Sequence, residues 1–314
     1  MNPYFSVVIP LFNKEKHIKT TLNSVWTQTF QDFEVIVVND GSTDNSLEII
    51  QSIQEDRLKI YSIENQGVSH ARNFGISKVT SDKIVFLDAD DIWYPHHLED
   101  LKKLFEAFPS CGLYCKAYKK QMGNLSIPSK YKDISKDSSW QGILSDYFES
   151  SLINSIAWTS AVMVPKSTFE RVGTFNENYN SGEDTDLWIR IALNFPVAFS
   201  NKVSAVHNLS SEQKITHSKL SSRQHLDFDD YQNNAQGNAS LKKYLDLNRY
   251  ALAIQYKLEN QLSQANKQYH KIDQNNLGML HRLIYNLPKS GIYFLMKFRT
   301  FLRKFNIDLR LFRG

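Results

Sequence analysis

Three carboxylates crowd the end of one apolar segment. The stretch "KIVFLDADDIWYPHHL" (83–98) passes from a hydrophobic run directly to Asp88, Asp90 and Asp91. Carboxylates this close raise one another's pKa values unless a cation lies among them. Mg²⁺ or Mn²⁺ is the simplest such cation, because it takes oxygen ligands, commonly one or two carboxylates with substrate phosphates and water. Asp88 and Asp90 would share a side of an extended backbone. The alternative is a solvated acidic loop in front of a helix that starts near Pro95.

A second acidic group lies a hundred residues later, in "GEDTDLW". Glu183, Asp184 and Asp186 are close enough in sequence for like-charge coupling, which lifts a carboxyl pKa toward the range in which a general base works. The alternative is structural, because acids at a helix N-terminus also complement the helix dipole.

The elements that must position these acids read as alternating strands and helices. Four nearly continuous apolar runs predict strands buried on both faces, as in a parallel sheet: 5–12, 33–40, 58–64 and 83–90. Helical spacing of apolar residues between them predicts helices near 18–26 and 47–53, the second capped by Ser42 or Thr43. The result is a doubly wound α/β sheet. Its ligands should bind beyond the strand ends, at 10–15, 39–44, 64–73 and 88–91.

The remaining chain predicts a second half and a helical extension. A helix is expected over 98–108, a strand in "WTSAVMVP", a short helix closed by Gly173 and an amphipathic helix in "DTDLWIRIALNF". Ser, Asn, Gln and His dominate from about 210 to 240. We therefore divide the chain into a catalytic domain (1–215, with halves 1–110 and 111–215), a polar connection (216–240) and a helical, basic C-terminal extension (241–314).

Five motifs in one order resemble family 2 glycosyltransferases, inverting enzymes with the GT-A fold that use nucleotide-sugar donors. They are "SVVIPLFNKEKHI", "SVWTQTFQDFEVIVVNDGSTDNS", "NQGVSHARNFGI", "IVFLDADD" and "VGTFNENYNSGEDTDLWIRI". The resemblance covers about 4–210. It implies a mainly parallel GT-A sheet flanked by helices.

The resemblance also implies residue roles. Pro10 would frame the nucleotide base, which Asp40 would bind through a hydrogen bond. Arg72 would lie near the diphosphate, where a guanidinium matches phosphate oxygens. Asp88 would face the ribose or a metal ion, and Asp90 would be the more direct metal ligand. Asp184 matches the catalytic base, with Glu183 beside it in the donor site. The family's paired acids before "GS" are here Asn39 and Asp40, so the role of position 39 is in doubt.

Other side chains carry weaker signals. His207 stands where related enzymes place a histidine near the metal or diphosphate, and His217 competes for that role. Trp158 either stacks on an acceptor sugar or packs in the core. His96 and His97 are expected on the first turn of a helix. Cys111 and Cys115 lack further nearby ligands for zinc and predict two ordinary thiols.

The C-terminal tail holds most of the positive charge. The 314 residues carry a net charge of +4, with 41% hydrophobic and 22% charged residues. From His281 onward there are eight basic residues and one acid, a net +7, so the rest sums to −3. In "GIYFLMKFRTFLRKF", six apolar residues share about a third of the helical wheel (Phe294, Leu295, Phe298, Phe301, Leu302 and Phe305), and Lys297, Arg299, Arg303 and Lys304 occupy the rest. This pattern is typical of a helix lying on an anionic membrane surface. A helix packed on the catalytic domain is the alternative, and nucleic-acid binding is not expected.

Together these patterns predict a metal-dependent inverting glycosyltransferase that moves a sugar, from a UDP-sugar by preference, to a glycan or lipid-linked acceptor in bacterial surface polysaccharide synthesis. Its cofactor would be Mn²⁺ or Mg²⁺. With no signal peptide or spanning segment read in the sequence, we expect it in the cytoplasm or on the inner face of the cytoplasmic membrane. A nucleotidyltransferase is the competing enzyme class, although "PLFNKEKH" lacks the glycine its phosphate loop needs. A non-catalytic, membrane-docked nucleotide-binding protein is the third hypothesis.

Overall fold

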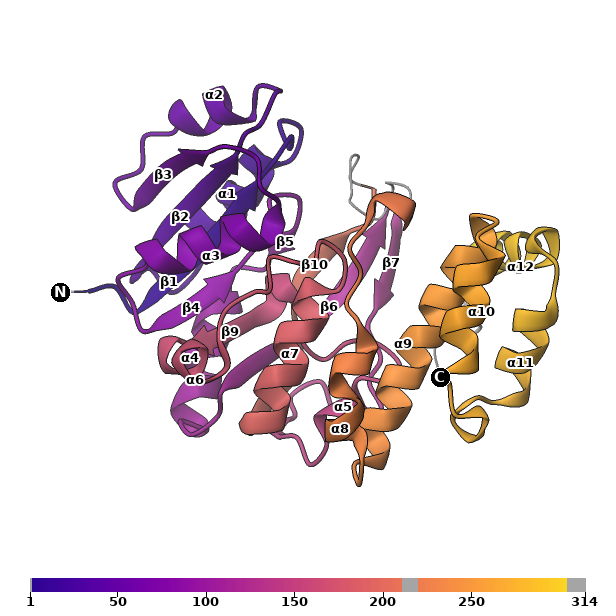
Figure 1. Ribbon diagram of the computed structural model, residues 1–314. Helices are drawn as coiled ribbons and strands as arrows, with labels where there is room; N and C mark the ends of the chain where they lie inside the picture. Colours follow the sequence, from indigo (N-terminus) through magenta and orange to yellow (C-terminus); the bar gives the residue numbers. More distant parts are fainter. Residues whose placement is uncertain (1, 211–219, 304–314) are drawn as a thin grey trace.

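The structure is a computed structural model that describes residues 2–210 and 220–303. Its N-terminal half alternates strands and helices along the chain (Figure 1). The elements of this half are β1 (Phe5–Leu11), α1 (Ile18–Trp26), β2 (Phe33–Asp40), α2 (Ser46–Gln51), β3 (Leu58–Ile63), α3 (Val68–Lys78), β4 (Lys83–Phe86), β5 (Ile92–Trp93) and α4 (His97–Ala107). Four strands form where the apolar runs predicted them, and the helices at 18–26 and 98–108 are confirmed. Strand β4 is shorter than the predicted 83–90: it ends at Phe86, and the N–H of Asp91 donates to the carbonyl of Asp88 at 3.0 Å in a turn, so the acids do not lie on the extended backbone that was expected.

The second half completes the sheet with strands that the sequence signalled weakly. Its elements are β6 (Leu113–Met122), β7 (Leu125–Pro128), β8 (Gln141–Ile143), α5 (Tyr147–Ser150), η1 (Thr159–Ala161), β9 (Val162–Pro165), α6 (Lys166–Val172), α7 (Glu183–Asn194) and β10 (Val197–Asn208). The sheet order is β3-β2-β1-β4-β9-β6-β10-β5, with β7 beside β6 and β8 beside β10. The three longest ladders, β1 with β2, β2 with β3 and β6 with β10, are parallel. The expected mainly parallel α/β sheet is therefore confirmed.

Helices cover both faces of this sheet because side chains alternate along each strand. Val7 and Ile9 of β1 pack into a core that includes Ile18 and Leu22 of α1 and Leu101 of α4. Val8, between them, packs into the other core with Ala71 of α3. The two-sided burial explains why β1 and β2 lack the apolar-polar alternation of a half-wet strand.

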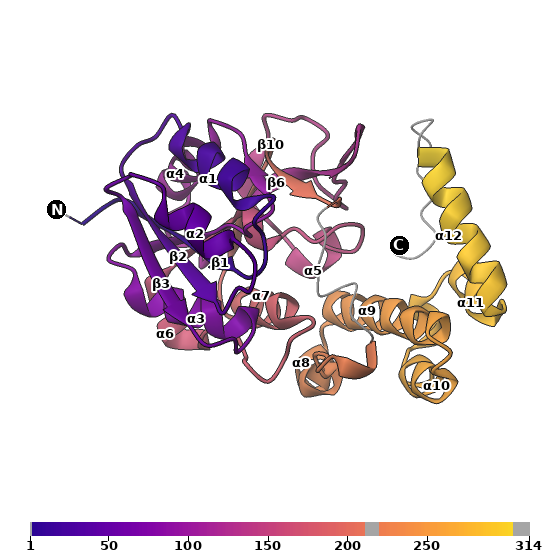
Figure 2. The ribbon, with the colours of Figure 1, turned by 90° about the horizontal axis from the view of Figure 1, so that it is seen from above.

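Helices follow the sheet to the end of the described chain. They are η3 (Leu220–Ser222), η4 (Phe228–Tyr231), α8 (Gln232–Ala235), α9 (Ala239–Leu258), α10 (Leu262–His270), η5 (Gln274–Asn276), α11 (Met279–Asn286) and α12 (Lys289–Arg303). None of the helices in the described ranges combines the length and apolar character needed to cross a bilayer. Figure 2 shows α10, α11 and α12 on the side of the molecule away from the N-terminal strands.

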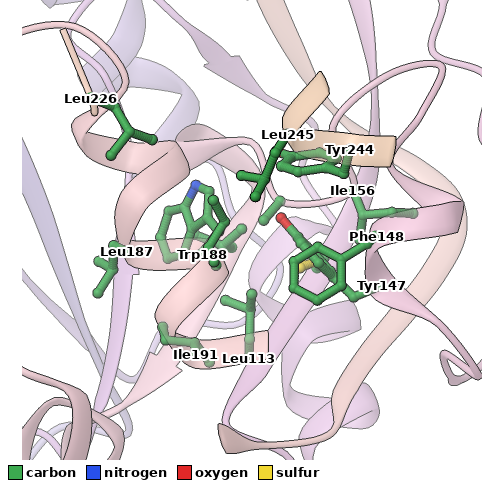
Figure 3. Packing of buried hydrophobic residues seen from close by; sticks show 14 of the residues in the cluster. Leu113, Tyr147, Phe148, Ile156, Leu187, Trp188, Ile191, Leu226, Tyr244 and Leu245 are labelled. Atoms are coloured by element: carbon green, nitrogen blue, oxygen red, sulfur yellow. The ribbon is translucent and has the colours of Figure 1, made fainter. Parts of the chain in front are cut away.

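Helix α9 packs directly on the half of the chain that forms the sheet. Tyr244 and Leu245 of α9 belong to the same buried cluster as Trp188 of α7 and Phe148 of α5, and Figure 3 shows these side chains together. Leu226, from the stretch predicted as a polar connection, joins this cluster as well. The C-terminal helices are thus anchored to the sheet through a continuous apolar core.

One local expectation is wrong. Neither Ser42 nor Thr43 caps α2, because Asn45 occupies the N-cap position without a side-chain cap bond. His96 and His97 begin α4 as expected, and His97 is fully buried there: it stacks on Trp93 with ring centroids 4.4 Å apart and shares a hydrogen bond with Ser204 Oγ. Burial holds the pKa of His97 well below its ordinary value, so the ring is neutral there.

Candidate functional site

A cleft of about 720 Å³ opens at the carboxyl ends of the N-terminal strands. It brings together seven of the residues predicted from sequence: Pro10, Asp40, Arg72, Asp88, Asp90, Glu183 and His207. Asp184 follows Glu183 in the first turn of α7. The four strand ends expected to meet at the sheet edge all contribute lining residues, which confirms that part of the geometric prediction.

Two of the lining loops are fastened to each other by side chains. The N–H of Asn13 donates to Ser42 Oγ at 3.1 Å, and the N–H of Thr43 donates to Asn13 Oδ1 at 2.8 Å. The N–H of Lys14 donates to Ser46 Oγ at 2.8 Å. Ser42 and Thr43 therefore form hydrogen bonds to the neighbouring loop and do not cap the helix. The loop that follows β1 is held in place, and Lys14 with it.

Asp40 fixes the turn that starts α3. The two oxygens of its buried carboxylate accept hydrogen bonds from the N–H groups of Gln66 and Gly67, each at 2.9 Å. Gly67 has φ +95, a conformation that side-chain-bearing residues rarely adopt. The carboxylate thus shapes the backbone beneath the cleft. Its predicted contact with a nucleotide base stays a prediction.

Arg72 is the central buried cation of the cleft. Its side chain is 4% exposed and donates to Asp88 Oδ1 at 2.8 Å and to Glu183 Oε1 at 3.1 Å. The ring of Phe175 lies 5.1 Å from its guanidinium carbon. Arg72 therefore joins the carboxylate after β4 to the carboxylate that begins α7, 111 residues apart in sequence. It positions both acids, and a direct diphosphate contact stays a prediction.

The other two acids of the triplet also have partners. Lys14 Nζ lies 2.9 Å from Asp90 Oδ2, with both side chains largely buried. Asp91 is buried and accepts hydrogen bonds from Ser160 Oγ at 2.7 Å and the N–H of Asn208 at 3.0 Å. Burial, together with the charges of Asp90 and Asp88, raises the pKa of Asp91 well above its ordinary value. The chain itself supplies cations for Asp88 and Asp90, which the sequence argument had assigned to a metal alone.

Burial changes the protonation equilibrium of Glu183, the first residue of α7. Glu183 lines the cleft and is 9% exposed. Burial, and next the charge of Asp184, raise the pKa of Glu183 to about 7, although Arg72 opposes the shift. Asp184 Oδ1 accepts the N–H of Thr185 at 2.6 Å. A pKa near neutrality lies in the range of general bases, and the assignment of the base role to Asp184, beside Glu183, stays a prediction.

One histidine lines the cleft and is backed by aromatic rings. His207 of β10 lines the cleft and stacks on Trp158, with ring centroids 4.9 Å apart. The Trp158 ring also lies 4.5 Å from that of Tyr118 in β6. Trp158 is thus half-buried between His207 and Tyr118, and its stacking on an acceptor sugar stays a prediction. His217, the competing candidate, lies outside the described residues.

The cleft contains residues that sequence reasoning missed. Arg223 and Ser222 line it, although they come from the stretch predicted as a polar connection. This stretch is joined to the turn before α7: the N–H of Asn180 donates to the carbonyl of Gln224 at 3.0 Å, and that of Leu226 to the carbonyl of Ser181 at 3.0 Å. Lys14 was also missed. No local pattern marks these residues, because their importance comes from long-range contacts.

The side chains of the cleft provide only part of the ligands that a divalent metal ion needs. Within residues 2–210 and 220–303 there is no group of three or more His, Cys, Asp or Glu side chains arranged to hold an ion. Asp88 and Asp90 both line the cleft, and Mg²⁺ or Mn²⁺ commonly binds through one or two carboxylates while phosphate oxygens and water complete the shell. The residues therefore fit a metal that arrives with a diphosphate, better than a metal bound by protein side chains alone.

Comparison with known proteins places this geometry in a family. Residues 6–175, more than half of the chain, match the family model described as "Glycosyl transferase family 2". The chain belongs to glycosyl transferase family 2. The matched part ends before the α7 acid pair, so the remaining lining residues lie outside it.

Curated glycosyltransferases are similar to the chain over part of their length. An uncharacterized glycosyltransferase of Rickettsia bellii is 31% identical over 60% of this chain and 26% of its own length, and one of Nostoc sp. is 39% identical over 34% of each chain. The chain thus spans about a third or less of the length of these relatives. Among solved structures, a fragment of S. aureus TarS in complex with UDP-GlcNAc aligns with a TM-score of 0.57 and 20% identity, over 88% of this chain and 74% of that chain. That likeness shows the shared fold.

Proposed function

We propose that this family 2 member is a metal-dependent inverting glycosyltransferase that moves a sugar from a UDP-sugar to a hydroxyl of a glycan or lipid-linked acceptor. One observation carries the proposal. The buried guanidinium of Arg72 joins Asp88, from the donor half, to Glu183, at the start of the helix that carries the predicted base. A cleft for a donor and an acid pair for the acceptor are thereby held together in one site.

The donor choice is supported by the fold neighbours. S. aureus TarS is known in complexes with UDP-GlcNAc and with UDP. In this chain Pro10 and Asp40 would lie at the base, and Asp88 at the ribose or metal. Asp88 and Asp90 would hold Mg²⁺ or Mn²⁺ together with the diphosphate, and His207 is a further candidate ligand. When bound, the metal neutralises charge that develops on the leaving diphosphate.

The chemical step needs only one carboxylate from the chain. The acceptor oxygen attacks the anomeric carbon, the bond from that carbon to the diphosphate oxygen breaks, and the acceptor proton passes to a carboxylate on the opposite face. Asp184 is the proposed base, and Glu183 stays beside it in the donor site. Arg72 holds Glu183 in place, and the charge of Asp184 helps to raise the pKa of Glu183. A single displacement of this kind inverts the anomeric configuration.

The test compares Asp184→Asn with Glu183→Gln. We expect Asp184→Asn to bind UDP with Mn²⁺ as the unchanged protein does, measured by thermal shift, and to lose transfer and donor hydrolysis against a panel of UDP-sugars. Glu183→Gln should retain measurable transfer. Full activity of Asp184→Asn would remove it from the base role. Incorporation of a nucleotide instead of a sugar would favour the nucleotidyltransferase, and no UDP binding at all would favour the non-catalytic hypothesis.

The acceptor proposal concerns bacterial surface polysaccharide synthesis on the cytoplasmic side of the membrane. A lipid-linked acceptor lies at a membrane surface, so an enzyme that also binds that surface would meet its substrate more often. The basic C-terminal extension is the part of the chain proposed to do this.

A further inference from the structure

Exposed apolar side chains gather at one end of the molecule. Of the eleven exposed large hydrophobic residues among the described ones, eight lie in α11 and α12. Met279 is 78% exposed and Phe294 is 66% exposed. Single exposed hydrophobic residues are ordinary, whereas a group this concentrated marks an interaction surface.

Helix α12 has two distinct apolar faces. Ile292 is fully buried and Leu295 is partly buried against the main core, which α12 reaches beside α9. Phe294, Phe298 and Phe301 recur at helical spacing on another face and remain exposed, with the rings of Phe294 and Phe298 stacked 6.1 Å apart. The two alternatives left open by the sequence thus combine: the helix packs on the protein through one face and presents a second to its surroundings.

Helix α11 repeats this arrangement. Ile284 and Tyr285 are buried, and the Tyr285 ring stacks on Tyr269 with centroids 3.6 Å apart. Met279, Leu280 and Leu283 are exposed. We give the name C-terminal platform to six of the eight exposed apolar residues of the two helices: Met279, Leu280, Leu283, Phe294, Phe298 and Phe301.

The charge of the platform selects its partner. Residues 279–303 contain five Lys or Arg and no Asp or Glu. Lys297 is exposed beside the Phe face, and its ammonium lies 4.8 Å from the centre of the Tyr293 ring. A second copy of the chain, placed on this surface by a two-fold axis, would bring the same positive charges together. An anionic lipid leaflet accepts both the cations and the apolar rings.

We propose that α11 and α12 lie in the plane of an anionic membrane leaflet, with the Phe294, Phe298 and Phe301 rings and the exposed residues of α11 inserted between headgroups. In this proposal both short helices bind the membrane surface, and not only the segment after residue 291. Binding needs no sugar transfer, so the inference stands or falls independently of the catalytic proposal.

The test is cosedimentation of the full chain with phosphatidylcholine vesicles and with vesicles that contain one third phosphatidylglycerol. We expect binding to the anionic vesicles to exceed binding to the neutral ones by more than about tenfold and to weaken as salt rises. Phe294→Ser with Phe298→Ser, and separately Met279→Ser with Leu283→Ser, should each reduce binding severalfold without lowering the melting temperature. Ile143→Ser is the matched control, because Ile143 is 46% exposed on β8, far along the chain.

Equal sedimentation with both vesicle types would overturn the proposal, as would unchanged binding of both double variants. Size-exclusion chromatography with light scattering provides the second readout. A stable dimer that the Phe294→Ser and Phe298→Ser changes dissociate would assign the platform to a second copy of the chain and refute the membrane assignment.

Discussion

Replacing Glu183 with Gln should change how the stability of the protein depends on pH. Burial raises the pKa of folded Glu183 from 4.5 to about 7. Below the unfolded pKa the carboxyl is protonated in both states. As pH rises, the unfolded chain ionises first, so the stability contributed by the protonated group is lost as pH passes through the folded pKa. At 1.36 kcal/mol per pKa unit the whole effect is about 3 kcal/mol.

Glutamine resembles the neutral acid and does not titrate. The free energy of unfolding of the unchanged protein, relative to Glu183→Gln, should therefore fall by about 2.5 kcal/mol between about pH 5 and pH 8. Urea denaturation of both proteins at several pH values measures the difference. A difference that stays constant with pH would refute the assignment of a raised pKa to Glu183.

Glu177→Gln is a control of opposite sign. Hydrogen bonds from Asn73 and His70 lower the pKa of Glu177. Its contribution to stability is present above the unfolded pKa and is lost as pH falls through the folded one. The free energy of unfolding of the unchanged protein, relative to Glu177→Gln, should therefore not fall as pH rises. This control separates the effect of burial at Glu183 from a general response of the protein to pH.

Two further perturbations test the packing and the ion pairs. Lys14→Met should raise the affinity for Mn²⁺ by about tenfold or more, because a metal ion that binds Asp90 in the unchanged protein must first displace the ammonium of Lys14. Paramagnetic resonance of free Mn²⁺ measures this affinity. Lys14→Arg keeps the positive charge and should bind Mn²⁺ as the unchanged protein does. An affinity that Lys14→Met leaves unchanged would exclude this competition. Gly75→Ala should destabilise by about 1–3 kcal/mol in thermal unfolding, since a Cβ would lie 2.5 Å from Val8 Cγ1, whereas Gly291→Ala in α12 should stabilise by up to about 1 kcal/mol. Equal melting temperatures for the two alanine variants would contradict the packing argument.

The N-terminal strands could be predicted because their burial is recorded in local sequence. β1 and β2 are buried at every position, so their runs are continuously apolar. Strand β6 escaped prediction for the opposite reason. It reads "LYCKAYKKQM", and its Lys116 is 1% exposed, held by Asp100 at 3.1 Å and Ser200 Oγ at 2.9 Å. A buried lysine cannot be distinguished from a surface lysine until its distant partners are known.

In the candidate site, too, local features could be predicted from the sequence and long-range contacts could not. The acids after β4 and at the start of α7 could be found from motif and charge alone. Their pairing could not, because Arg72 reaches Glu183 across 111 positions and Lys14 reaches Asp90 across the cleft. Ser42 and Thr43 illustrate the same limit, since bonds to a neighbouring loop outcompete the local cap that their residue types favour.

The strand order has a consequence for synthesis of the protein on the ribosome. β4 pairs with β1 on one side and with β9 on the other, and β9 begins at Val162. Roughly eighty residues lie between the end of β4 and the start of β9. At a translation rate of about 5–20 residues per second, β9 is therefore synthesised about 4 to 16 s after β4. During that interval one edge of β4 has no neighbour, and an open strand edge is a template for pairing with other chains. Between the emergence of Phe86 and that of Val162, the nascent chain is therefore exposed to pairing with other chains at this edge.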